Sequence, residues 1–356
     1  MPSRRRDDFA LSLLALLLRG SSPLTTTMEA QSSRLAARAS RAARATRGDV
    51  RGGILWLEHL NIVIGDRALA EKFYFEEGLG LTRDPSKPGG DTPGTMWANL
   101  GWQQIHLAPE SDDLPPRAAR GAVGLVLPKA SEAFDRLERL GVDPERHGSS
   151  AFTVTCPTSG NVFHCYDVDD YEPSTTLDDE KDDEDDQRKK AGAPPRSTTK
   201  MAEIHRKGDG RLDVRGGPGI RYVYVRCGDA TTVAMNYAQL LGQRVDFDDG
   251  LATVDLGVGP VHLLLESTPD DDDVENGFHA CVYVDNFAKR YRDLHEFVFT
   301  NPRFKHLDTC DTLDEALQSR TFRFKFPDAK NLEHETRAVS HFSFLKHIAY
   351  DGPPPP

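Results

Sequence analysis

Two histidines occupy equivalent places in a stretch of sequence that the chain contains twice. The first copy, WANLGWQQIHLAPES, covers residues 97–111, and the second, TVDLGVGPVHLLLES, covers residues 253–267. Each copy reads as a strand, a glycine turn and a second strand that carries His106 or His262. Imidazoles placed in this way could ligate a metal ion or form hydrogen bonds. The repeat itself indicates that the fold is built from duplicated units.

A second group of chemically capable side chains lies in NLEHETR, residues 331–337. Glu333 and Glu335 share one face of the predicted strand, and His334 points to the other face. Either glutamate could ligate a metal ion. Arg337 could instead pair with one of them, in which case the cluster would be structural.

The repeated stretch belongs to larger modules that share one order: a strand, a helix, and then two or three strands. Each helix has one apolar stripe and each sheet one apolar face, so the modules must pack in pairs to bury them. The first strands of the four modules are predicted at residues 54–66, 122–127, 221–229 and 278–284. Their helices follow at 68–81 and 131–140, around Tyr237, and around Tyr291 and Leu294.

This order resembles the vicinal oxygen chelate superfamily, which includes glyoxalase I, bleomycin-resistance proteins and extradiol dioxygenases. The motifs that carry the resemblance are a histidine opening the first strand, FY…LG closing the first helix, and the hairpin PTSGNVFHCYD at residues 157–167. The resemblance implies an α+β fold with four βαβββ modules paired into two tandem domains with cup-shaped mixed sheets. The first domain would cover residues 53–170 and the second residues 218–345.

In the resembling family, metal ligands come from the first and last strands of each module. Carried over to this chain, the first domain offers His59, His106 and His164. The fourth ligand position is occupied by Ala122, whose side chain has no atom that could bind a metal. Three neutral imidazoles with an open position could hold a divalent metal such as Zn²⁺, Mn²⁺ or Fe²⁺. Asn61 and Gln104 alternate onto the same faces as His59 and His106, and are predicted to bind substrate or orient the ligands.

In the second domain, the same family positions carry His262, His279 and a carboxylate near Glu333. Two histidines and one carboxylate suit Fe(II), as in extradiol dioxygenases. Tyr222 departs from that pattern, because it stands where that family has its first histidine. We predict that Tyr222, Glu335 and Arg337 contact the substrate.

The predicted function is therefore the binding of a small oxygen-rich molecule in a cup, through a divalent metal. Lyase, isomerase or ring-opening dioxygenase chemistry is what the resemblance implies for an enzyme of this kind. The alternative is a metal-free protein that sequesters a small molecule, as bleomycin-resistance proteins do. A homodimer is also compatible with the sequence. The formal net charge of -12 argues against a nucleic-acid partner.

Three segments are predicted to lie outside the folded domains. Residues 1–52 read as a disordered targeting leader, in which an apolar run is too short to span a bilayer and regularly spaced arginines follow it. This leader resembles a plastid transit peptide, with a mitochondrial presequence as the alternative, and predicts a soluble mature protein without a membrane segment. Residues 171–217 read as an acidic disordered linker, and residues 346–356 as a proline-rich tail. Five widely spaced cysteines without a CxxC pair indicate a reducing compartment.

Overall fold

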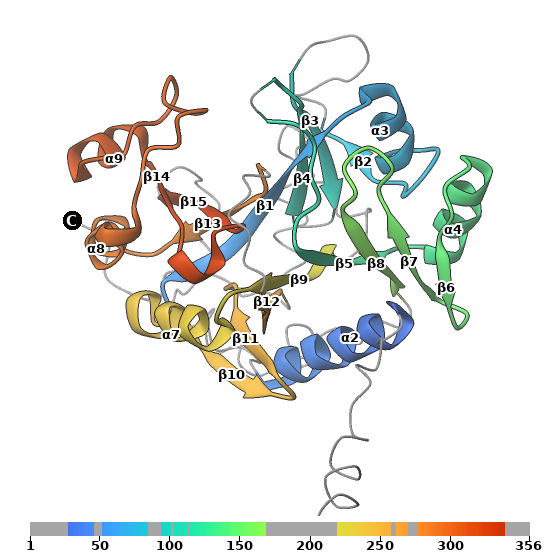
Figure 1. Ribbon diagram of the computed structural model, residues 1–356, viewed down its shortest axis with the longest axis horizontal. Helices are drawn as coiled ribbons and strands as arrows, with labels where there is room; N and C mark the ends of the chain where they lie inside the picture. Colours follow the sequence, from blue (N-terminus) through green and yellow to red (C-terminus); the bar gives the residue numbers. More distant parts are fainter. Residues whose placement is uncertain are drawn as a thin grey trace, which may run out of the picture.

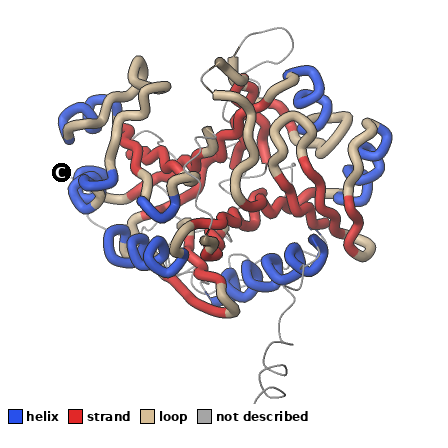
Figure 2. Tube along the Cα trace, viewed as in Figure 1, coloured by secondary structure: helices blue, strands red, loops and turns tan. Residues whose placement is uncertain are grey.

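The structure, a computed structural model, describes residues 28–45, 52–84, 94–100, 103–112, 114–168, 219–257, 261–269 and 277–338. Its strands form two sheets, and most of its helices lie around the outside of them (Figure 1, Figure 2). The predicted linker at 171–217 and the predicted tail at 346–356 lie outside the described residues.

The first sheet has seven strands in the order β14-β15-β13-β1-β4-β3-β2. It combines strands of the first and fourth modules. The first module provides β1 (Ile54–Ile64), β2 (Thr82–Arg83), β3 (Met96–Leu100) and β4 (Gln103–Pro109). The fourth module provides β13 (His279–Val284), β14 (Thr321–Phe324) and β15 (Glu333–Ala338).

The second sheet has eight strands in the order β10-β11-β12-β9-β5-β8-β7-β6. It combines strands of the second and third modules. The second module provides β5 (Gly121–Leu127), β6 (Glu145–His147), β7 (Ala151–Thr155) and β8 (Val162–Asp167). The third module provides β9 (Gly219–Cys227), β10 (Val245–Asp248), β11 (Leu251–Asp255) and β12 (His262–Ser267).

This topology confirms the α+β class, the four modules and their pairing into two mixed sheets. The expectation that each sheet would combine modules adjacent in sequence is wrong. The first strand of module one pairs antiparallel with that of module four, as β1 with β13. The first strand of module two pairs likewise with that of module three, as β5 with β9. Strand alternation defines which face of a strand is apolar, but does not select the partner that its edge will pair with.

The helices cover the apolar faces of the sheets, and α3 (Arg67–Tyr74) and α7 (Ala230–Leu241) begin at aspartate caps. The Asp66 side chain accepts a hydrogen bond from the Leu69 amide at the start of α3, and Asp229 caps the start of α7 in the same way. Gly242 ends α7 with a φ of 68°, a left-handed conformation that favours glycine. These helices are α3 (Arg67–Tyr74), α4 (Ala130–Arg139), α7 (Ala230–Leu241), α8 (Phe287–Asp293) and α9 (Leu313–Ser319). No helix among the described residues is long and apolar enough to cross a membrane.

Alternation along the strands separates a hydrophobic face from a polar one. In β1, Leu60 and Ile62 belong to the large hydrophobic core that both sheets share. His59 and Asn61 therefore point to the opposite face of the seven-stranded sheet. The same alternation in β13 places Ala280 in the core and His279 on the polar face. The first and fourth modules thus bring their polar residues to one surface.

The helix α2 (Met28–Ala45) lies in the segment predicted to be a disordered leader, and for these residues that prediction is wrong. It packs on the eight-stranded sheet, below β5, β8 and β9 in Figure 1. Leu35 and Ala39 are buried there against Tyr222 and Tyr224. Arg38, only 3 % exposed, forms salt bridges with acidic residues of β10, as does its neighbour Arg41. Arginines at helical spacing occur in packed amphipathic helices as well as in leaders, so the pattern alone does not separate the two.

Replacing Leu35 by alanine is expected to lower the free energy of unfolding by about 2–5 kcal/mol, because a leucine with 1 % exposure leaves a cavity when truncated. Denaturant unfolding measures the change. Ser33→Ala, at an exposed position of the same helix, is the control and should change stability by less than about 0.5 kcal/mol. Equal stability of both variants would show that α2 is not part of the folded unit.

Candidate metal centre

Strand register places the polar side chains of the seven-stranded sheet in two adjacent rows. In the first row, His59 of β1 lies beside Gln104 of β4 on one side and Cys281 of β13 on the other, and Cys281 lies beside Glu335 of β15. The second row begins one pleat away, with Asn61 between His106 and His279. Glu333 completes it next to His279.

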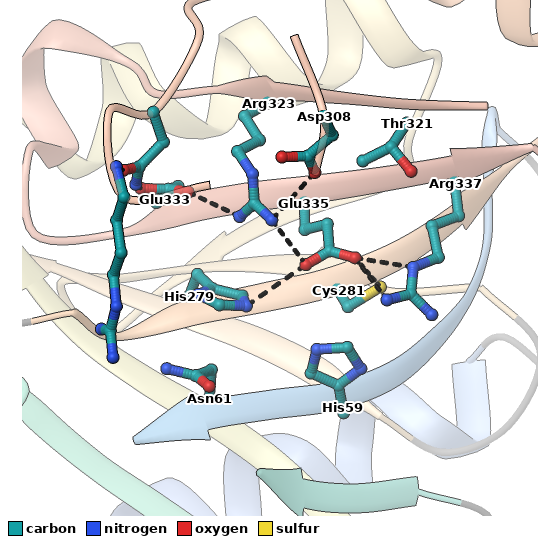
Figure 3. Close-up of polar contacts among 12 residues, drawn as sticks. His59, Asn61, His279, Cys281, Asp308, Thr321, Arg323, Glu333, Glu335 and Arg337 are labelled. Carbon is teal, nitrogen blue, oxygen red and sulfur yellow. Dashed lines mark hydrogen bonds and ion pairs between the residues drawn. The ribbon is translucent and has the colours of Figure 1, made fainter. Parts of the chain in front are cut away.

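Three side chains from neighbouring strands converge where the two rows meet. His59, His279 and Glu335 each offer one ligand atom, and these atoms all lie within 4.8 Å of one another. Nε2 of His279 lies 3.4 Å from Oε2 of Glu335, and all three residues are buried (Figure 3). Two imidazoles and a carboxylate in this arrangement form a donor set that suits a divalent transition metal.

Two arginines hold the carboxylates around this group. The Arg323 guanidinium donates to Glu333 at 2.8 Å, to Glu335 at 3.0 Å and to Asp308 at 3.2 Å (Figure 3). Arg337 donates to Oε1 of Glu335 at 2.6 Å. It also donates to Oε2 of Glu58 at 3.1 Å. Four carboxylates face two guanidiniums here, so acidic groups outnumber basic ones around the centre, although burial raises the pKa of Asp308.

The protonation states of two of these side chains favour metal binding. Burial and the neighbouring His106 lower the pKa of His59 well below its usual range, so the imidazole is neutral near pH 7. Burial opposes the charged form of Glu335, but Arg337, His279 and Arg323 outweigh it and hold the pKa of that carboxyl well below its usual range. A neutral imidazole and an ionised carboxylate are the forms that bind metal ions.

His106 takes a different position from the one predicted for it. Its ring is stacked between Trp97, at a centroid distance of 4.3 Å, and His59, at 3.7 Å. Its Nε2 lies 3.1 Å from Oε1 of Gln104, whose amide nitrogen donates to Asp84 at 2.8 Å. His106 is therefore placed to orient the His59 ring, and it is absent from the metal-capable groups among the described residues.

Another predicted substrate contact on this face, Asn61, donates from its amide to the Gly277 carbonyl at 2.9 Å. Asn61 thus anchors the chain just before β13. A role of Asn61, Gln104, Glu335 or Arg337 towards a substrate remains a prediction.

A segment between α8 and α9 covers the centre. The Phe304 ring meets the His279 ring edge-on at a centroid distance of 5.8 Å. The Arg323 guanidinium lies 4.0 Å above the same phenylalanine ring. Asn301 donates to Oε2 of Glu333 at 2.7 Å. This segment shields the carboxylates from water.

Sequence reasoning missed Glu58, Cys281, Asp308 and Arg323. A signal for Arg323 exists in TFRFKF, because Phe322 and Phe324 are buried in the core and alternation places the arginine between them on the polar face. No comparable pattern marks Asp308, which reaches the centre from a loop.

The expected three-histidine site of His59, His106 and His164 is wrong, because His164 lies in the other sheet. Its Nδ1 lies 2.7 Å from the hydroxyl of Tyr222, and the Tyr166 hydroxyl lies 2.8 Å from that same oxygen. Burial, followed by the nearby His147, lowers the pKa of His164 to about 4. The pair of Tyr166 and Tyr222 lies against α2.

The expected ligand set of His262, His279 and Glu333 is also divided between the sheets. His262 lies on the eight-stranded sheet, where its Nδ1 is 2.9 Å from Oδ1 of Asp255. His279 and Glu333 lie side by side on the seven-stranded sheet. Both corrections have one cause: the module partners differ from those expected, so the first-strand histidine of module one meets that of module four.

Comparison with known proteins gives solved structures of low sequence identity. No family model and no curated protein matches the chain. Glyoxalase I from Zea mays is 13 % identical, with 83 % of this chain and 97 % of that chain covered and a TM-score of 0.48. A protein proposed to be a dioxygenase, from Bacillus subtilis subsp. subtilis str. 168, is 14 % identical, with 84 % and 91 % covered and a TM-score of 0.48. The cppA protein from Streptococcus pneumoniae TIGR4 is 12 % identical, with 81 % and 100 % covered and a TM-score of 0.41.

Three βαβββ modules and a fourth with only two strands after its helices pair two by two in this chain, into two mixed sheets. The chain has the vicinal oxygen chelate fold. On the face away from the shared hydrophobic core, the seven-stranded sheet carries the metal-capable residues and the eight-stranded sheet carries α2. The likeness concerns the fold alone, since this fold hosts many chemistries.

Proposed function

We propose that this chain binds one divalent metal ion through His59, His279 and Glu335, and uses it to hold a small oxygen-rich molecule. The observation that carries the proposal is the convergence of these three buried side chains, from three neighbouring strands, within 4.8 Å. Two imidazoles and one carboxylate suit Fe(II) and related ions, and leave further coordination positions open. The excess of acidic groups around them favours a cation.

A metal bound here supplies a Lewis acid that can polarise a carbonyl or enolate oxygen of the ligand. The surrounding protein orients the metal-binding side chains. The Trp97–His106 stack fixes the plane of the His59 ring, and Arg337 and Arg323 fix the Glu335 carboxylate. Phe304 restricts the access of water to His279.

Among the chemistries of this fold, the site favours ring-opening dioxygenase chemistry over proton transfer of the glyoxalase type. Proton transfer requires a general base beside the metal. Two further carboxylates lie beside these residues, and both are already paired. Arg323 and Asn301 occupy the two oxygens of Glu333 at 2.8 Å and 2.7 Å, and Arg337 donates to Glu58 at 3.1 Å. A two-histidine, one-carboxylate set leaves room for two vicinal substrate oxygens and for dioxygen.

The test is metal content after anaerobic reconstitution with Fe²⁺ or Mn²⁺. We expect one ion per chain in the wild type, and an affinity lower by at least about 100-fold in His279→Ala, because a lost ligand should cost more than a lost orienting residue. His262→Ala, which removes a buried histidine from the other sheet, is the matched control and should retain the ion. A wild-type protein that binds neither ion would overturn the proposal. Oxygen uptake with catechols tests the reaction class.

A metal-free binding protein is the second candidate, favoured by one observation. Both oxygens of Glu335 already accept hydrogen bonds from arginines, so this buried carboxylate has partners even without a metal ion. On this alternative, small molecules with vicinal oxygens would bind equally well in the presence and absence of EDTA. Binding that is lost with EDTA supports the metal centre instead.

A further inference from the structure

We propose that Glu58, His59 and Cys281 form a second, thiolate-containing position for the metal ion, and that a soft metal occupies it in place of the position at His279 and Glu335. The inference deepens the proposed function and rests on it, since both positions share His59. The resemblance to the family assigns no role to Cys281, which lies two residues after the expected ligand His279.

The geometry of the first row brings a sulfur atom beside the histidine. Cys281 is the direct strand neighbour of His59 and of Glu335. Its Sγ lies 3.6 Å from Oε2 of Glu58 and 3.7 Å from Oε1 of Glu335. The ligand atoms of Glu58, His59 and Cys281 all lie within 4.8 Å of one another, and the three residues are buried.

An irregularity in β1 makes this group possible. The pairing of β1 with β13 shifts between Leu57 and His59, as at a β-bulge. Strict alternation would send Glu58 and His59 to opposite faces. The shift instead lets the Glu58 carboxylate reach the Cys281 sulfur on the face that carries His59.

One buried nitrogen faces this group without a partner. Nδ1 of His59 has no hydrogen-bond partner among the described residues, although the side chain is only 1 % exposed. It lies 3.9 Å from Oε2 of Glu58. Buried polar atoms are usually satisfied, and those that are not require an explanation. A metal ion between Nδ1, the Glu58 carboxylate and the Cys281 sulfur would satisfy this one.

Arg337 positions the two carboxylates on either side of the sulfur. It donates to Glu58 at 3.1 Å and to Glu335 at 2.6 Å, and Figure 3 shows it beside Cys281. The guanidinium therefore holds Glu58 towards the thiol while Glu335 remains near His279.

The two positions are alternatives for a single ion. A neutral imidazole carries a proton on one nitrogen and donates a lone pair from the other, so His59 serves one ion at a time. Nitrogen, sulfur and oxygen donors together suit Zn²⁺ or Co²⁺, whereas harder ions such as Mn²⁺ avoid thiolate. On ligation the Cys281 thiol releases its proton to solvent.

Reconstitution with Co²⁺ tests the inference, because thiolate ligation gives an intense near-ultraviolet charge-transfer band that nitrogen and oxygen ligands do not give. We expect one Co²⁺ per wild-type chain and a clear band. Cys281→Ser should lose the band and still bind one Co²⁺, through His279 and Glu335. His279→Ala should keep the band. Cys310→Ser is the control, since Sγ of this buried cysteine donates to the Phe299 carbonyl, which a serine hydroxyl can also reach, and it should keep the band.

The outcomes separate the two proposals. One bound Co²⁺ without the band in the wild type, or a band that persists in Cys281→Ser, overturns the thiolate position and leaves the proposed function standing. A wild-type chain that binds no Co²⁺, Fe²⁺ or Mn²⁺ overturns both. A band that disappears in His279→Ala would show that the thiolate position does not exist by itself, and would also overturn the inference.

Discussion

Replacing His59 by alanine is expected to abolish stoichiometric binding of every divalent metal, the largest single effect on this chain's chemistry. His59 contributes to both groups of metal-capable side chains found among the described residues. Its removal leaves each group with two ligands, too few for a buried site to compete with hydrated ions. Metal content after reconstitution with Fe²⁺, Mn²⁺ and Co²⁺, followed by dialysis, measures the loss.

His106→Ala is the matched comparison for His59→Ala. His106 is stacked 3.7 Å from His59 and belongs to neither group. Its loss removes a residue that orients a ligand, which typically costs about 10–100-fold in affinity, so the ion should still bind at high concentration. If instead His106→Ala abolished binding and His59→Ala retained it, the assignment of ligands on this sheet would be wrong.

Replacing Arg323 by leucine is expected to lower the free energy of unfolding by about 3–5 kcal/mol, the largest single effect on stability. Arg323 is 2 % exposed, and its guanidinium pairs with Glu333, Glu335 and Asp308. The leucine would leave these carboxylates with fewer partners in a buried environment, which favours their protonated forms. Denaturant unfolding measures the change, and Arg292→Leu on the exposed side of α8 should shift stability by less than about 0.5 kcal/mol.

The pH dependence of this effect has a definite sign. Burial already raises the pKa of Asp308 in the folded protein, against the pull of Arg323, so without Arg323 this pKa should rise further. Stability from a group with a raised folded pKa is present at low pH and is lost as the pH rises through that pKa. The deficit of Arg323→Leu should therefore be smaller near pH 5 than near pH 7. A deficit that is independent of pH would indicate lost packing and not unpaired charge.

Some features of the site could be read from the sequence. Alternation in β1 and β15 places His59 with Asn61, and Glu333 with Glu335, on polar strand faces, as the structure confirms. The repeated order of elements predicted four modules and two mixed sheets. These features depend on periods of two and of three to four residues within one strand or helix, and such local periodicity is visible in the sequence.

The position of α2 in the fold could not be predicted from local patterns. The regularly spaced arginines of this segment predicted part of a disordered leader, whereas the structure contains a helix there. Its position was decided by acidic residues far along the chain, because Arg34 and Arg38 pair with Asp249 and Asp246. The sequence of the helix alone does not predict which acidic residues its arginines will pair with.

The sequence by itself determined the modules, the polar faces and the histidines they carry, because these follow from local alternation. Only the tertiary structure decided that His59 meets His279 and Cys281, while His164 meets Tyr222. All four modules present similar apolar faces, so hydrophobic burial can be satisfied by more than one pairing. The choice between them depends on contacts between strands more than 200 residues apart, such as β1 with β13, that no local pattern encodes.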